Sequence, residues 1–112
     1  MQTDRELLEL AAKSINGFYN EKTDAISFDG FDALKYNFAN WIPWNPLNNS
    51  GNALDLAIKL GIGISFGVQD ARVVASGMDS IYGEWEKIDG DPFAATRRAI
   101  VRAAAEIGKE MK

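Results

Sequence analysis

The sequence predicts an α+β protein with three helices and a mainly antiparallel sheet of about four strands, in the order α-β-α-β-β-β-α. Three segments repeat apolar residues at helical spacing between capping residues. Three consecutive later segments have the alternation of strands, with turn residues between them. Because so small a sheet needs helices to cover it, we expect helices on both faces, which makes a three-layer α/β/α sandwich.

Capping residues mark the ends of the first two predicted helices. Thr3 and Glu6 have the spacing of a capping box, and Asn16-Gly17 ends the first helix. The second helix is predicted to begin near Ser50, as its N-cap, and to stop at Gly61. Its apolar stripe is Ala53, Leu54, Ala57, Ile58 and Leu60.

The third predicted helix has the clearest start in the chain. Asp91 is a good N-cap, and Pro92 suits the first helical position because the donor that it lacks would be unpaired there. One face of this helix carries Phe93, Ile100, Ala104, Ile107 and Met111. The other face carries a basic ridge of Arg98, Arg102 and Lys109.

Strands are predicted at Ala25–Phe28, Gly61–Val68, Ala71–Gly77 and Ser80–Ile88, the last three forming an antiparallel meander. Hairpin turns are expected at residues 69–70 and 77–79. The strand at 61–68 presents its large apolar side chains on one face and leaves Gly61, Gly63, Ser65 and Gly67 on the other. We expect a helix to approach this bare face closely. Residues 30–40 fit either a short strand or a loop packed by its own aromatic residues.

Composition limits the chemistry that this chain can perform. Its 112 residues, 46% hydrophobic, suit one domain over residues 1–112 with a core that needs no disulfide or metal. The chain has no cysteine and no histidine. Thiolate nucleophiles, thiolate zinc sites and imidazole acid–base catalysis are therefore excluded, and we expect no cofactor.

Charge and hydropathy point to a protein of the cytosol. The net charge is −4, and the first ten residues, MQTDRELLEL, lack the apolar core of a signal peptide. No run reaches the roughly 18 apolar residues of a membrane span, so we expect no membrane partner. An acidic protein binds nucleic acid poorly, but residues 91–112 hold five basic and three acidic groups.

The motifs that suggest chemistry have simpler structural explanations. The glycines at 61, 63 and 67 miss the dinucleotide-binding pattern, because position 66 is Phe66 and the run follows a helix. Acidic pairs occur at Asp29/Asp32, Glu84/Glu86 and Asp89/Asp91. They could bind a divalent cation or act as acid and base, but their positions suit turns, a helix cap and a solvent-facing strand.

Two surfaces are candidates for binding. Eight of the twelve aromatic residues lie between positions 18 and 44, ending in a corner at residues 41–46 that holds Trp41, Trp44 and two prolines. They either pack this segment onto the sheet or offer a surface to a partner or ligand. The ridge of Arg98, Arg102 and Lys109 either meets phosphates or an acidic partner, or is a solvated face with Glu106 as counter-charge.

Three stretches, in order, resemble a known family: RELLELAAK at 5–13, WNPLNNSGNALDLAIKLGIGIS at 44–65, and DPFAATRRAIVRAAAEIGKE at 91–110. They cover about half the chain and are similar to the phage ABA sandwich domain family of small phage proteins. The resemblance implies an α/β/α sandwich encoded by a tailed phage or prophage. It implies no activity, so no catalytic residue is carried over. Residues 17–40 do not follow the family pattern.

We therefore expect a non-enzymatic phage accessory protein that acts by protein–protein contact in the host cytosol. The partner would be a host protein, a phage protein or a second copy of the chain. The alternative function is nucleic-acid binding through the basic face of the last helix. An enzyme would need a convergent carboxylate pair or a metal site, and is the least favoured hypothesis.

Overall fold

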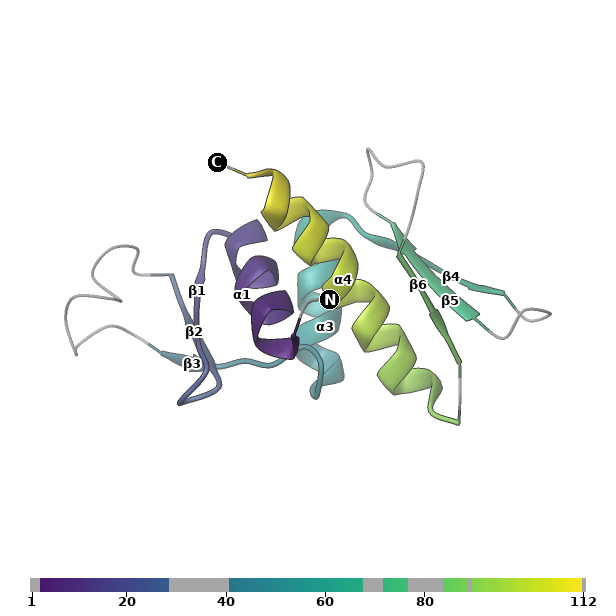
Figure 1. Ribbon diagram of the computed structural model, residues 1–112, viewed down its shortest axis with the longest axis horizontal. Helices are drawn as coiled ribbons and strands as arrows, with labels where there is room; N and C mark the ends of the chain where they lie inside the picture. The colour runs from purple at the N-terminus through teal and green to yellow at the C-terminus, as the bar shows by residue number, and fades with distance from the viewer. Residues whose placement is uncertain (1–2, 29–40, 68–71, 77–83, 89, 112) are drawn as a thin grey trace.

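The computed structural model describes residues 3–28, 41–67, 72–76, 84–88 and 90–111. Over these residues the protein is α+β, with three helices and two small antiparallel sheets (Figure 1). The helices are α1 (Asp4–Ser14), α3 (Ser50–Leu60) and α4 (Pro92–Glu110). Sheet A holds β1 (Phe18–Asn20), β2 (Ala25–Ser27) and β3 (Ile42–Pro43), and sheet B holds β4 (Gly63–Gly67), β5 (Arg72–Ser76) and β6 (Glu84–Lys87).

The helices lie between the two sheets (Figure 1). Helix α4 is central and packs against α1, α3, β5 and β6, while α1 packs on its other side against β1. The three-layer sandwich with helices on both faces of one sheet is thus not confirmed by the described residues. The difference arises because the segment that follows α1 forms its own small sheet, which covers α1 on the side away from α4.

The predicted helix ends are confirmed, with one correction. Thr3 forms the capping box, Asp91 caps α4 by accepting from two backbone N–H groups, and Gly61 ends α3 at a φ of 65°. The N-cap of α3 is Asn49 and not Ser50, because the Asn49 side chain accepts from the backbone N–H three residues on, at 2.9 Å. Asparagine and serine cap about equally well, so the sequence could not separate two adjacent candidates.

Small residues on α4 let its neighbours approach closely. Most of the buried residues of this helix are alanines, and the buried set is Ala99, Ile100, Val101, Ala103, Ala104, Ala105 and Gly108. A Cβ on Gly108 would lie 2.0 Å from the backbone oxygen of Leu10, so the backbones of α1 and α4 are in direct contact there. Helices rarely come this close unless one contributes a residue without a side chain.

The apolar faces of α3 and α4 are only partly buried. Ala53 and Ala57 of the predicted α3 stripe are buried together with Leu56, but Leu54 is 56% exposed and Ile58 is 68% exposed. Phe93, predicted on the buried face of α4, is exposed in its first turn. The period of apolar residues located both helices correctly, but it overestimated how wide a stripe the neighbouring elements cover.

Helices were expected on both faces of sheet B, with the closest approach on the bare glycine face; helix α4 lies on the other face, which carries Ile64 and Phe66. Phe66 pairs with residue 73, and residue 73 pairs with Glu86, so Phe66 and Glu86 share a face. Glu86 binds arginines of α4, which places the helix on that face. The bare face of Gly63 and Ser65 therefore points away from α4. The predicted meander itself is confirmed, with β4 paired to β5 and β5 paired to β6.

Sheet A was only partly predicted. The strand expected at 25–28 is observed as Ala25–Ser27, but β1 and β3 were not expected. These strands have three and two residues, too few for an alternation to be visible, and β3 contains Pro43, which suits only a sheet edge. The two predicted hairpin turns at 69–70 and 77–79, and the ambiguous segment at 30–40, lie outside the described residues.

Candidate interaction surfaces

The two tryptophans of the aromatic corner have different environments. Trp44 is only 7% exposed, and its ring centroid lies 6.1 Å from that of Tyr19 at an interplanar angle of 60°. This tilted arrangement is favourable for aromatic pairs and joins the segment before α3 to β1. Trp41 is partly exposed. Trp44 therefore packs inside the molecule, and of the pair only Trp41 has surface to offer a partner.

Asp24 organises the polar side of this corner. It has a φ of 52°, and its carbonyl oxygen accepts from the backbone N–H of Trp44 at 3.0 Å. Its carboxylate accepts from the Tyr19 hydroxyl at 2.5 Å and from the Asn45 side-chain amide at 2.9 Å. Burial, and then the hydrogen bond to Asp24, raise the pKa of Tyr19 well above its ordinary value. The phenol is thus a hydrogen-bond donor here and no candidate base.

The basic ridge of α4 is bound to the rest of the molecule. Arg98 lies 3.1 Å from Asp4 of α1 and 3.5 Å from Glu86 of β6. Arg102 forms a short ion pair with the same Glu86. The expectation that Glu86 points to solvent is wrong, because its side chain lies between sheet B and α4. These two arginines connect three elements across the molecule.

The other cations of α4 also have partners. Arg97 donates from Nε to the backbone oxygen of Leu47 at 2.9 Å and from Nη1 to Ser50 Oγ at 3.0 Å. Lys109, at the exposed end of the ridge, lies 3.7 Å from Glu106. The predicted neutralisation of Arg102 by Glu106 is therefore replaced by two separate pairs. Nothing in the sequence indicated Glu86 as the partner, because sixteen residues separate it from Arg102.

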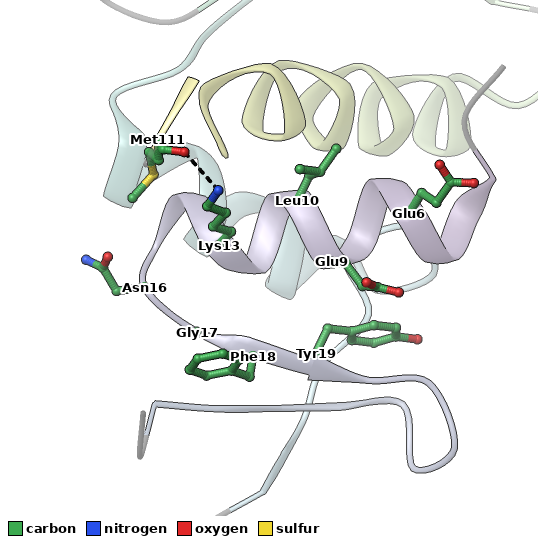
Figure 2. Close-up of a pocket in the computed structure, with 9 residues that line it drawn as sticks. All are labelled: Glu6, Glu9, Leu10, Lys13, Asn16, Gly17, Phe18, Tyr19 and Met111. Carbon is green, nitrogen blue, oxygen red and sulfur yellow. Dashed lines mark hydrogen bonds between the residues drawn. The ribbon is translucent and has the colours of Figure 1, made fainter. Parts of the chain in front are cut away.

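A cavity of about 750 Å³ opens between α1 and β1 (Figure 2). Its lining combines Glu6, Glu9 and Lys13 of α1 with the rings of Phe18 and Tyr19 and with Met111. Lys13 reaches the backbone oxygen of Met111 at 2.8 Å (Figure 2). Nothing in the sequence indicates this cavity, because its two walls come from elements whose packing the periodicity does not determine.

The charged groups of the cavity do not converge on a common point. Glu6 belongs to the capping box, Glu9 is paired with Arg5 at 3.1 Å, and Lys13 binds the C-terminal segment. Glu6 and Lys13 stand at opposite ends of the cavity (Figure 2). Within the described ranges, no cluster of three or more acidic residues could hold a metal ion. The arrangement suits contact with an apolar group better than proton transfer.

Large apolar side chains remain exposed on several elements. They are Phe28, Ile42, Leu54, Ile58, Ile64, Phe66 and Phe93. Leu54 and Ile58 are one turn apart on α3, and Ile64 and Phe66 are two apart on β4, so each pair lies on one face of its element. Paired exposure of this kind is typical of surfaces that meet another molecule. Among the helices that the structure describes, none is long and apolar enough to cross a membrane.

Comparison of the chain with family models, with curated proteins and with solved structures gives no match.

Proposed function

We propose that this protein is a non-enzymatic accessory protein that acts by binding another protein through an apolar surface. The observation that carries the proposal is the exposure of Leu54 and Ile58 side by side on α3, an ordered and well-capped helix. A helix that leaves two large aliphatic residues in water has free energy to gain from a partner that covers them.

The polar candidates support the same proposal by elimination. Arg98 is paired with Asp4 and Glu86, Arg102 is paired with Glu86, and the carboxylates of the cavity are held by separate partners. A catalytic site needs groups that converge on one reacting atom. An apolar contact needs only exposed area, which this molecule has.

The biological setting of the proposal rests on the resemblance to the phage ABA sandwich domain family. We propose that a tailed phage or prophage encodes the protein and that it acts in the host cytosol, with a host or phage protein or a second copy as partner. The three-layer α/β/α arrangement that the resemblance implies belongs to this proposal as well. A structure determined by NMR, with both faces of sheet B assigned, would test it.

The proposal is tested by tagging the chain and recovering it from phage-producing cells. We expect a protein that is retained by the wild type and lost from the variant Leu54→Asp/Ile58→Asp. The matched control, Thr23→Asp/Asn48→Asp, adds the same charge at exposed polar positions and should retain the protein. Recovery of the same proteins with all three chains, or of none with the wild type, would contradict the proposal.

Nucleic-acid binding by α4 ranks second. It draws on the basic excess of residues 91–112, but Arg98 and Arg102 would first have to leave Glu86. Titration of labelled DNA and RNA at low salt tests it. A complex that weakens steeply with salt and is lost in Arg98→Gln/Arg102→Gln would favour this alternative, and no binding in 50 mM salt would end it.

A further inference from the structure

We propose that β4 pairs with β4 of a second copy of the chain, so that two three-stranded sheets B join into one antiparallel sheet of six strands. The inference rests on the proposed function, since it names one protein partner and the surface that meets it. It depends on three observations: the edge that β4 leaves open, the side chains that it exposes, and the symmetry of its sequence.

Strand β4 is an edge strand without protection. In the part of the chain that the structure describes, β4 pairs only with β5, so its outer backbone groups have no strand beside them. Proteins usually guard such edges with charge, proline or shortness. Strand β6 has two glutamates and a lysine, and β3 has two residues, one of them proline. Strand β4 reads Gly-Ile-Ser-Phe-Gly and carries none of these devices.

The exposed side chains of β4 lie on the face of sheet B that packs against α4. Phe66 is 56% exposed and Ile64 is 37% exposed, although both lie on the same face of sheet B as α4. The main contacts of α4 with sheet B are to β5 and β6, and the Ile64 and Phe66 side chains at the β4 edge of that face stay exposed. A strand added beside β4 would therefore bury apolar surface of Ile64 and Phe66 that is still exposed to water.

The sequence of β4 favours its own copy as the added strand. In an antiparallel pair that overlaps all five residues, Ser65 faces Ser65 of the second copy and Ile64 faces Phe66 of the second copy. The interface thus contains two pairs between a β-branched and an aromatic residue, a favourable cross-strand combination. The two-fold axis is perpendicular to the sheet, so the helices of both copies lie on the same side.

The opposite face of the joined strands would be smooth. Gly63, Ser65 and Gly67 present no bulky side chain there, so nothing on β4 hinders the approach. A contact of one five-residue strand per copy buries little surface compared with the roughly 1,200–2,000 Å² that stable complexes bury. Because a single shared strand is the main contact, we expect a weak dimer with a dissociation constant on the order of micromolar.

The first experiment measures mass against concentration by sedimentation equilibrium. We expect the wild type to change from monomer to dimer, and Ile64→Lys/Phe66→Lys to stay monomeric because four lysines would meet at the seam. The variant Ile64→Lys/Phe66→Glu should regain the dimer, because the introduced lysine of one copy faces the introduced glutamate of the other. Ile42→Lys, at a strand residue of similar exposure (51%), should dimerise like the wild type.

The second experiment uses the absence of cysteine from the chain. In Ser65→Cys the two introduced thiols would face each other across the two-fold axis, at a Cα separation that a disulfide spans. Mild oxidation should convert most of this variant to a covalent dimer. Asn48→Cys, at an exposed turn position, should form at most a small fraction of dimer under the same conditions.

Two results would overturn the inference: a wild type that remains monomeric at hundreds of micromolar, or a dimer that Ile64→Lys/Phe66→Lys leaves intact. A folded Ile64→Lys/Phe66→Glu chain that stays monomeric would overturn the register, and circular dichroism checks its folding. If the wild type is monomeric but a partner is still lost from Leu54→Asp/Ile58→Asp, the inference fails while the proposed function stands. If Leu54→Asp/Ile58→Asp loses no partner, but the dimer forms and responds to the β4 variants as expected, the inference stands and the proposed function through α3 fails.

Discussion

Single residues hold the aromatic corner in place, and Asp24 is the most connected of them. Its backbone adopts a left-handed conformation that aspartate tolerates better than most residues. From there it accepts hydrogen bonds from Tyr19, Asn45 and the backbone of Trp44. The corner that turns the chain into α3 is thus fixed by a carboxylate twenty residues earlier in the sequence.

Replacing Tyr19 by Phe should change how stability depends on pH. Up to a pH of about 10, folded and unfolded chains both keep the phenol proton. Above that value the unfolded chain loses it while the folded protein retains it, because the pKa of Tyr19 is raised in the folded state. The free energy of unfolding of the wild type should therefore fall as pH rises beyond about 10.

Urea denaturation of both proteins at about pH 8 and about pH 11 measures this effect. At the lower pH, Tyr19→Phe should be less stable by about 1 kcal/mol, the loss of one hydrogen bond. At the higher pH the difference in the free energy of unfolding between the two proteins should be smaller, because the wild type loses stability there and the variant, which lacks the phenol, does not. A gap that is the same at both pH values would show that the environment of Tyr19 does not favour its protonated form.

Residue identity predicted the caps but not the contacts of the candidate surface. Thr3, Asp91 and Gly61 could be assigned because caps act within four residues along the chain. The pairing of Glu86 with Arg98 and Arg102 could not, because it depends on which face of sheet B meets α4. The glycines at 63 and 67 suggested a close helix on the bare face, whereas α4 lies on the other face, since close approach is only one of several reasons for glycine in a strand.

At the scale of elements, the contact between α1 and α4 is unusually close. Gly108 lies against the backbone of Leu10, and most of the other buried residues of α4 are alanines. Such packing relies on shape and tolerates little added volume. It also explains why a helix of modest hydrophobicity can be the centre of the core, because small side chains bring neighbouring backbones into van der Waals contact.

Gly108→Ala should destabilise the protein although alanine is the better helix former. A Cβ at this position would overlap the Leu10 oxygen, so α1 must move away, at an expected loss of about 1–3 kcal/mol in the free energy of unfolding. Gly51→Ala on α3 is the matched control, because its Cβ would meet only the Asn49 side chain, at 3.1 Å. We expect the control to change stability by less than about 1 kcal/mol.

Urea denaturation followed by circular dichroism measures both variants. A stabilised Gly108→Ala would contradict the close contact, because the gain in helix propensity would then exceed the steric cost.

Elements were easier to predict than their arrangement. The three helices and the β4–β6 meander follow from periodicity and caps, which are local signals. Strands β1 and β3 have too few residues to show a pattern, and the pairing of β3 with β2 joins positions more than fifteen residues apart. Leu54 and Ile58 look like core residues in the sequence, because periodicity marks an apolar face without showing whether a neighbour covers it.

At the scale of the whole molecule, α4 contacts elements of both halves. Sheet B, α1 and α3 all pack on it, and its arginines extend those contacts to Asp4, Glu86 and Ser50. Sheet A is attached through α1 and the aromatic corner. The free energy of local opening should therefore be greatest along α4 and smallest in sheet A, which has the shortest strands.

Amide hydrogen exchange tests this distribution. The slowest amides should be those of residues 99–105 of α4, which are buried except for Arg102, and the strands β1 and β3 should exchange several orders of magnitude faster. NMR or mass spectrometry under native conditions gives both rates in one sample, so sheet A is an internal control. Equal protection in the two regions would show that the whole protein opens in a single step.

The order of the elements along the chain has a consequence for biosynthesis. Every other helix and strand that the structure describes precedes α4, yet α1, α3, β5 and β6 all pack against it. On a ribosome, these segments emerge with their apolar faces uncovered and must wait until residue 110 has left the exit tunnel. Production of this protein should thus depend on holdase chaperones during translation, more than for a chain whose central helix is made first.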